Sequence, residues 1–177
     1  LEWQSQAVTG EGGITYYRSG TVGPDFGCGD NWGLPCGWGA AKALKALSAV
    51  PAGQRTPTVQ RAIDACAAFL LSRDPAAADY PYRDKVGSAW FRFGFPISYW
   101  SDVLEVASLL AAQGYGGDPR LTNALRWILS KQDGQGRWKM QNALAGKMWA
   151  DIEKQGQPSK WVTLRAERAL QAMQGSA

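Results

Sequence analysis

The chain contains no histidine among its 177 residues. This absence excludes Ser-His-Asp and Cys-His triads, histidine general bases and every metal site that needs an imidazole ligand. Cysteine is scarce: Cys28, Cys36 and Cys66 are the three present, and no Cys-x-x-Cys motif occurs. An odd count without that motif argues against a disulfide framework and against a strong zinc motif. We therefore expect no metal site and no cofactor.

The cysteines nevertheless leave local alternatives open. Cys66 lies in a helical pattern and is expected to be a small core residue. Cys28 shares a Gly-rich loop with Asp30 and Cys36. Free thiols, a disulfide between Cys28 and Cys36, or a metal site completed by ligands from elsewhere would each fit this loop.

Long apolar runs and clusters of basic residues are also missing. No run approaches the roughly 20 apolar residues that a membrane-spanning helix needs, so we expect no transmembrane segment. The first residues lack the basic and apolar regions of a signal peptide, and we expect a cytoplasmic protein. The net charge of +4 is scattered without a Lys/Arg block, so no nucleic-acid partner is expected. The missing initiator methionine is consistent with a fragment or a processed form.

Tryptophan is abundant, with 9 copies. Large aromatic side chains serve either core packing or a cavity that stacks on a ligand and holds a cation. A chain of 177 residues that is 45% hydrophobic can form one domain with a real core. We expect a single domain over residues 1–177, with residues 1–35 mostly loop and a short strand at 14–17.

Apolar periodicity predicts helices at about 37–49, 57–72, 98–113, 119–131 and 159–173. Thr56 and Asp118 are expected N-caps, because a proline follows each of them at the first helical position. Residues 143–154 fit either a short helix or a loop. Trp161 and Leu164 are predicted core residues of the last helix, and Leu129 of the fourth.

Residues 90–138 show the plan of the chain: a helix, a turn, a second helix and a polar turn that ends in Gly-x-Trp. The start of the helix at 57–72 resembles the start of the helix at 119–131, which gives a repeat period of about 60 residues. This pattern predicts an all-α fold. We expect an α/α-toroid-like, partial or open, array of helical hairpins.

A family resemblance follows from residues 132–138, where Gly-Arg-Trp follows an Asp-bearing turn. This segment resembles the repeat signature of the terpene cyclase and protein prenyltransferase superfamily. The chain looks closest to a bacterial squalene-cyclase-like branch of it. The matching segments are residue 36 with 41–47, 55–57, 93–96, 102–105, 118–121 and 158–164. The resemblance implies an α/α toroid with a central cavity, and an isoprenoid or another apolar small molecule as the ligand.

The chain departs from that superfamily in three respects. The Asp-x-Asp-Asp acid motif of squalene-hopene-type cyclases does not occur, and no histidine exists to complete a prenyltransferase zinc site. The predicted helices are also too few for a closed toroid. An open arc, self-association into a ring, or membership in a longer chain would each account for the shortage.

Asp102 and Glu105 are the candidate catalytic residues. They lie three positions apart and would share one face of the helix predicted at 98–113, close to Tyr99 and Trp100. A carboxyl group held among aromatic rings loses hydration and can act as a proton donor. Such an acid could protonate an alkene while aromatic faces hold the resulting cation. The alternative is that Asp102 caps or salt-bridges a neighbouring loop while Glu105 is solvated.

A second set of residues could bind a ligand. Arg92, Arg137 and Lys160 stand beside aromatic or Gly-rich turns and could receive a diphosphate or a carboxylate. They could equally tie carbonyl groups or a carboxylate of the next repeat, and the aromatic residues could simply pack. The full set of candidates is Trp90, Arg92, Phe93, Phe95, Tyr99, Trp100, Arg137, Trp138, Lys160 and Trp161.

Two function classes therefore remain. The first is a ligand-binding or scaffold domain whose concave aromatic face holds an apolar or carbohydrate-like ligand. The second is a metal-independent isoprenoid cyclase or prenyltransferase-like enzyme that uses Asp102 as the general acid. The missing acid motif and the missing histidine favour the first class for this chain, whereas the resemblance favours the second for a longer parent.

Overall fold

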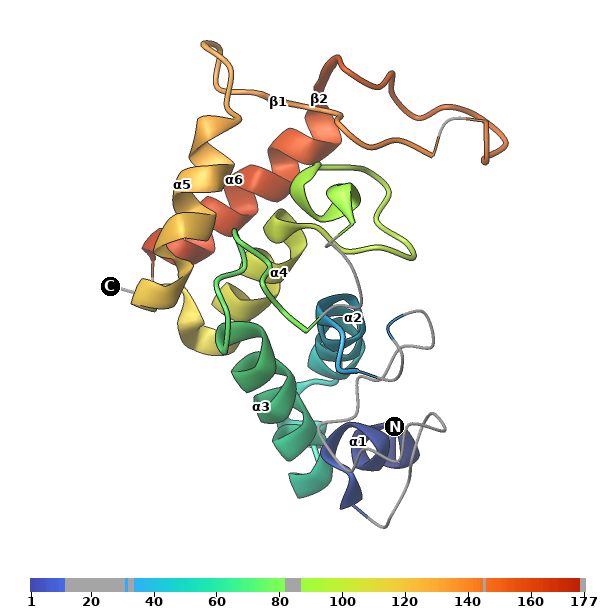
Figure 1. The fold of residues 1–177 in the computed structure, drawn as a ribbon, viewed down its shortest axis with the longest axis vertical. Helices are drawn as coiled ribbons and strands as arrows, with labels where there is room; N and C mark the ends of the chain where they lie inside the picture. The colour runs from blue at the N-terminus through green and yellow to red at the C-terminus, as the bar shows by residue number, and fades with distance from the viewer. Residues whose placement is uncertain (12–30, 32–33, 82–86, 145, 176–177) are drawn as a thin grey trace. The chain divides into compact units, whose positions relative to one another are not determined.

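The computed structural model describes residues 1–11, 31, 34–81, 87–144 and 146–175 (Figure 1). The chain forms two compact units, Leu1–Val86 and Gly87–Ala177, and each is described by itself. The single domain expected over 1–177 therefore stays a prediction. The strand expected at 14–17 and the loop that holds Cys28 and Asp30 lie outside the described residues.

The described residues are mostly helical, in keeping with the expected all-α class. The α-helices are α1 (Glu2–Thr9), α2 (Gly37–Ser48), α3 (Pro57–Leu71), α4 (Val103–Leu110), α5 (Thr122–Ser130) and α6 (Lys160–Gln174). Short helical turns are η3 (Ala52–Gln54), η4 (Ser88–Phe91), η5 (Ala111–Tyr115) and η6 (Pro119–Leu121). A two-stranded antiparallel sheet pairs β1 (Trp138–Lys139) with β2 (Pro158–Ser159).

In the first unit, α1 and α2 both pack on α3. Helix α3 begins where the sequence predicts, because the Thr56 hydroxyl accepts a hydrogen bond from the Val59 amide at 3.2 Å and Pro57 follows it. The predicted face of α3 is buried, including Ile63 and Cys66. Cys66 is fully buried, which confirms the prediction of a core residue, and burial raises the pKa of its thiol.

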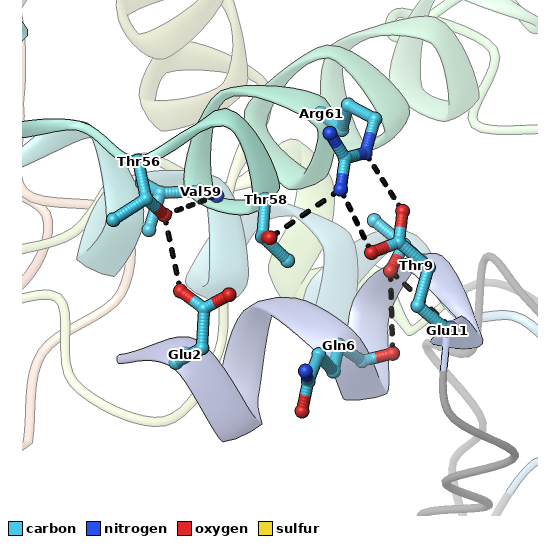
Figure 2. A network of polar contacts seen from close by, with 8 residues as sticks. All are labelled: Glu2, Gln6, Thr9, Glu11, Thr56, Thr58, Val59 and Arg61. Carbon is cyan, nitrogen blue, oxygen red and sulfur yellow. Dashed lines mark hydrogen bonds and ion pairs between the residues drawn. The ribbon is translucent and has the colours of Figure 1, made fainter.

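Polar contacts fasten α1 to the start of α3 (Figure 2). The Thr56 hydroxyl donates to the Glu2 carboxylate at 3.0 Å. Arg61 places Nε 2.7 Å and Nη2 2.9 Å from the two carboxylate oxygens of Glu11. The Arg61 guanidinium also lies 3.3 Å from the Thr58 hydroxyl. These contacts fix α1 at both of its ends, whereas apolar packing fixes its middle through the buried Ala7 and Val8.

In the second unit, α4 is the central element, and α5 and α6 pack against it and against each other (Figure 1). Residues 103–107 are all buried. A helix buried on all sides must be apolar around its whole circumference, which explains why its sequence shows a nearly continuous apolar run. Glu105 is the exception within that run and is only 6% exposed, so the expectation that it is solvated is wrong.

The polar turn at 133–137 connects α5 to β1. Oδ1 of Asp133 accepts hydrogen bonds from the Gln135 and Arg137 amides, both at 2.9 Å. Trp138 follows, fully buried, and its indole N–H donates to the Ile128 carbonyl at 2.7 Å. The Gly-x-Trp signature thus ends a turn and anchors β1 against the last turn of α5.

The structure corrects several predicted elements. Helix α1 occupies residues that were expected to be loop. Helix α4 begins at Val103 rather than near residue 98, because Asp102 caps it. Residues 146–157 form turns and bends, which fits the loop rather than the short helix of the two alternatives left open for residues 143–154. The predicted core residues Trp161 and Leu164 of α6 are 36% and 40% exposed, and Leu129 of α5 is also exposed. The buried face of each helix is formed instead by the residues next to these positions.

Candidate functional site

Asp102, the candidate general acid, is fully buried and caps α4. Its Oδ1 accepts a hydrogen bond from the Glu105 amide at 2.7 Å, and its Oδ2 accepts one from the Gly94 amide at 3.3 Å. Arg165 of α6 donates to both oxygens, from Nη2 at 2.8 Å to Oδ1 and from Nη1 at 3.1 Å to Oδ2. Four N–H donors therefore surround one carboxylate.

These contacts match the structural alternative for Asp102. A carboxylate accepts hydrogen bonds through its oxygen lone pairs, and here each oxygen already serves two donors. A general acid must instead present an O–H to its substrate. Asp102 and Glu105 also do not share a helical face, because Asp102 precedes the first turn and binds the Glu105 backbone. The position of Asp102 thus favours a capping and ion-pairing role.

The predicted aromatic residues do not gather in one cavity. Trp90, Phe93 and Trp138 are buried. Phe95 and Trp161 stack on each other, with ring centroids 4.9 Å apart and planes inclined by 8°. The cavity that Phe95 lines has a volume of about 10 Å³, room for about one water molecule.

The remaining predicted residues differ in exposure and in the contacts that they make. Tyr99 is 69% exposed and Trp100 is half-buried. Nη2 of Arg92 donates to the Ser88 hydroxyl at 3.0 Å. The Lys160 ammonium lies 5.7 Å from the Trp161 ring centroid. Arg137 forms an ion pair with Asp133 at 3.1 Å, which lies within its own turn rather than in a neighbouring repeat.

The second unit has a larger recess at the end of α5, beside β1. Its volume is about 330 Å³, which falls at the lower end of the range for small-molecule sites. Its lining combines two predicted aromatic residues with a set of polar side chains. The lining residues are Phe93, Ser130, Lys131, Gln132, Asp133, Trp138, Lys139 and Gln141.

Lys131 is the central cation of this recess. Its Nζ lies 4.6 Å from the centroid of the Trp127 ring and 5.3 Å from that of Phe93. Gln141 Oε1 accepts a hydrogen bond from Nζ at 3.0 Å and another from the Phe93 amide at 3.2 Å. Aromatic faces attract a cation, and the glutamine oxygen fixes its position. The ammonium group is therefore held in place by neutral groups.

The electrostatics of the recess leave this cation available. Among the residues that the structure describes, no carboxylate forms an ion pair with Lys131. Burial lowers the pKa of Lys131, and the more distant charge of Asp102 opposes that shift. Asp133 lines the same recess, but its carboxylate already accepts hydrogen bonds from Arg137. These hydrogen bonds, first the one from the Arg137 amide, lower the pKa of Asp133.

Sequence reasoning missed Lys131, Gln132, Lys139 and Gln141, although it identified Phe93 and Trp138. One signal was present, since Lys131 follows Trp127 by four positions and side chains at that spacing meet on a helix. Gln141 carried no signal, because the turn at 133–137 brings it back toward Phe93. In the described part of the chain, no group of His, Cys, Asp or Glu side chains gathers that could hold a metal ion.

Comparison with known proteins adds no relative: no family model, no curated protein and no solved structure matches the chain. Within the described residues, no helix has both the length and the apolar character needed to cross a membrane.

Proposed function

We propose that residues 87–177 form a small-molecule-binding module whose recess at Lys131 holds a ligand with an apolar body and one carboxylate. The observation that carries the proposal is the ammonium of Lys131, held by Trp127, Phe93 and Gln141 without an ion-pair partner among the described residues. A partly buried cation gains most from an opposite charge that arrives with little water. The buried side chains of Phe93 and Trp138 form the apolar part of the recess lining.

Binding is preferred over the enzyme alternative because of Asp102. Its oxygens accept N–H groups from Glu105, Gly94 and Arg165, so it has no place for a substrate. Protonation of an alkene requires an available acid, and the one carboxyl group that lines the recess at Lys131 is that of Asp133, which already pairs with Arg137. The recess therefore fits recognition better than protonation.

We also propose that the helical hairpins are arranged as in an α/α toroid, as the resemblance to terpene cyclases and protein prenyltransferases implies. Its support is the packing of α2 on α3 in the first unit, and of α4, α5 and α6 together in the second. An isoprenoid remains a candidate for the apolar body of the ligand.

A binding screen with paired ligands tests the function. Phenylacetate and geranate are each compared with the matching amide, phenylacetamide or geranamide, by ¹H–¹⁵N NMR of the full chain. We expect saturable shifts for a carboxylate at the amides of Lys131, Trp138 and Gln141, and at least tenfold weaker binding of its amide. Lys131→Met should weaken carboxylate binding at least tenfold, and Lys154→Met, an exposed lysine outside the recess, should not.

The proposal fails if neither carboxylate binds, or if each binds no better than its amide. It also fails if Lys131→Met binds as well as the unmodified chain. Preference for geranate over phenylacetate would support the isoprenoid class, and the reverse preference would remove it.

A further inference from the structure

The Lys131 amine has the surroundings of a nucleophile as well as those of a cation site. Its Nζ is held by Gln141 and by the rings of Trp127 and Phe93, so it has less conformational freedom than the amine of an exposed lysine. Burial lowers the pKa of Lys131, which enlarges the fraction of neutral amine near neutral pH. Only the neutral amine attacks a carbonyl carbon, and lysines in such settings form Schiff bases.

We infer that Lys131 condenses with the keto group of a small 2-oxo acid bound in the recess, an inference that rests on the proposed function. The ammonium first loses a proton to solvent. The nitrogen lone pair then forms the C–N bond while the carbonyl π electrons move to oxygen, which takes up a proton. The nitrogen has by then released one of its protons, and the neutral carbinolamine loses its hydroxyl as water by taking up a proton from solvent, which leaves the protonated C=N bond. No oxidant or reductant is consumed.

A 2-oxo acid fits because it carries both required groups on adjacent carbon atoms. Its carboxylate meets the same need for an anion as the ligand of the proposed function. The protonated imine keeps one positive charge at the Lys131 nitrogen, so the carboxylate still faces a cation after condensation. Lys139 lines the same recess and supplies a second positive charge. An aldehyde without a carboxylate would lack both attractions.

Reductive trapping tests the inference. The full chain is incubated at neutral pH with phenylpyruvate and sodium cyanoborohydride, and the adduct is located by intact mass and peptide mapping. We expect one adduct per chain, on Lys131, at least tenfold above any other lysine. Lys131→Met should abolish that adduct, whereas Lys139→Met should leave Lys131 as the labelled residue. Circular dichroism of Lys131→Met confirms that the loss is not unfolding.

Adducts spread evenly over exposed lysines such as Lys147 and Lys154 would overturn the inference, as would the absence of any adduct. The two proposals fail separately. Lys131-dependent binding of phenylacetate without trapping of phenylpyruvate removes the condensation and leaves the binding function. If neither phenylacetate nor geranate binds, the proposed function is wrong. If benzaldehyde labels Lys131 as strongly as phenylpyruvate does, the ligand class is not a 2-oxo acid.

Discussion

Arg165 donates two hydrogen bonds to the carboxylate of Asp102, from Nη2 to Oδ1 at 2.8 Å and from Nη1 to Oδ2 at 3.1 Å. Nη1 also donates to the Gly94 carbonyl at 2.5 Å. A forked pair of this kind is stronger and more directional than a single charged hydrogen bond. In the second unit it joins α6, the start of α4 and the segment at Gly94.

The first prediction concerns the loss of this pair. Asp102→Ala should lower the free energy of unfolding by about 3–5 kcal/mol, because Arg165 is only 20% exposed and would lose its buried partner. Asp118→Ala, which removes a cap that is only partly buried, should cost about 1 kcal/mol. Urea unfolding followed by circular dichroism measures both. Equal, small losses would show that the pair does not hold the unit together.

Gly94 gives the second prediction. A Cβ at this position would overlap the carbonyl oxygen of Asn142, whereas a Cβ at Gly134 meets no atom within 4 Å. Gly94→Ala should therefore destabilise the chain by about 1–3 kcal/mol, as forced overpacking does. Gly134→Ala is the matched control and should leave the urea midpoint nearly unchanged. A Gly94→Ala midpoint equal to that of the control would contradict the close approach.

Helix positions could be predicted well from the sequence, because caps and apolar spacing are local signals. Thr56 and Asp118 mark starts that the structure confirms. Asp102 is an equally good cap, but the aromatic residues before it extend the apolar pattern and hide the true start of α4. Helix α1 was missed because its eight residues show only a weak apolar stripe and gain their order from packing on α3.

The candidate site was predictable only in part, because it depends on contacts that are distant in sequence. Phe93 and Trp138 stood out as aromatic residues next to turns. The partner of Asp102 did not, since Arg165 follows it by 63 positions. Gln141 reaches Lys131 only after the chain reverses at Asp133. Side-chain chemistry alone gave no reason to choose Lys131 over the other lysines.

The third prediction concerns pH and the first unit. The hydrogen bonds from Arg61 hold the pKa of Glu11 below its ordinary value. The unfolded chain therefore takes up this proton first as the pH falls, so the contribution of the pair is present above the ordinary glutamate pKa and is lost as the pH falls through the folded value. Glu11→Gln should be less stable than the unmodified chain at neutral pH. Urea unfolding at decreasing pH should show the two stabilities converging; a constant gap would mean that the carboxylate charge is irrelevant.

We expect Lys131 to lower the free energy of unfolding of the chain at neutral pH. Burial lowers its pKa, so below the folded value the folded chain carries an ammonium that the unfolded chain solvates better. Between the folded and unfolded pKa the unfolded chain binds more protons, and stability rises with pH in that window. Lys131→Met, which keeps the length and removes the charge, should therefore be at least as stable as the unmodified chain at neutral pH. Its advantage should shrink as the pH rises toward the ordinary lysine pKa. Lys154→Met, at an exposed position, serves as the control and should show no such trend. If Lys131→Met is clearly less stable at neutral pH, the aromatic contacts stabilise the fold, and the lysine then has a structural reason to be there.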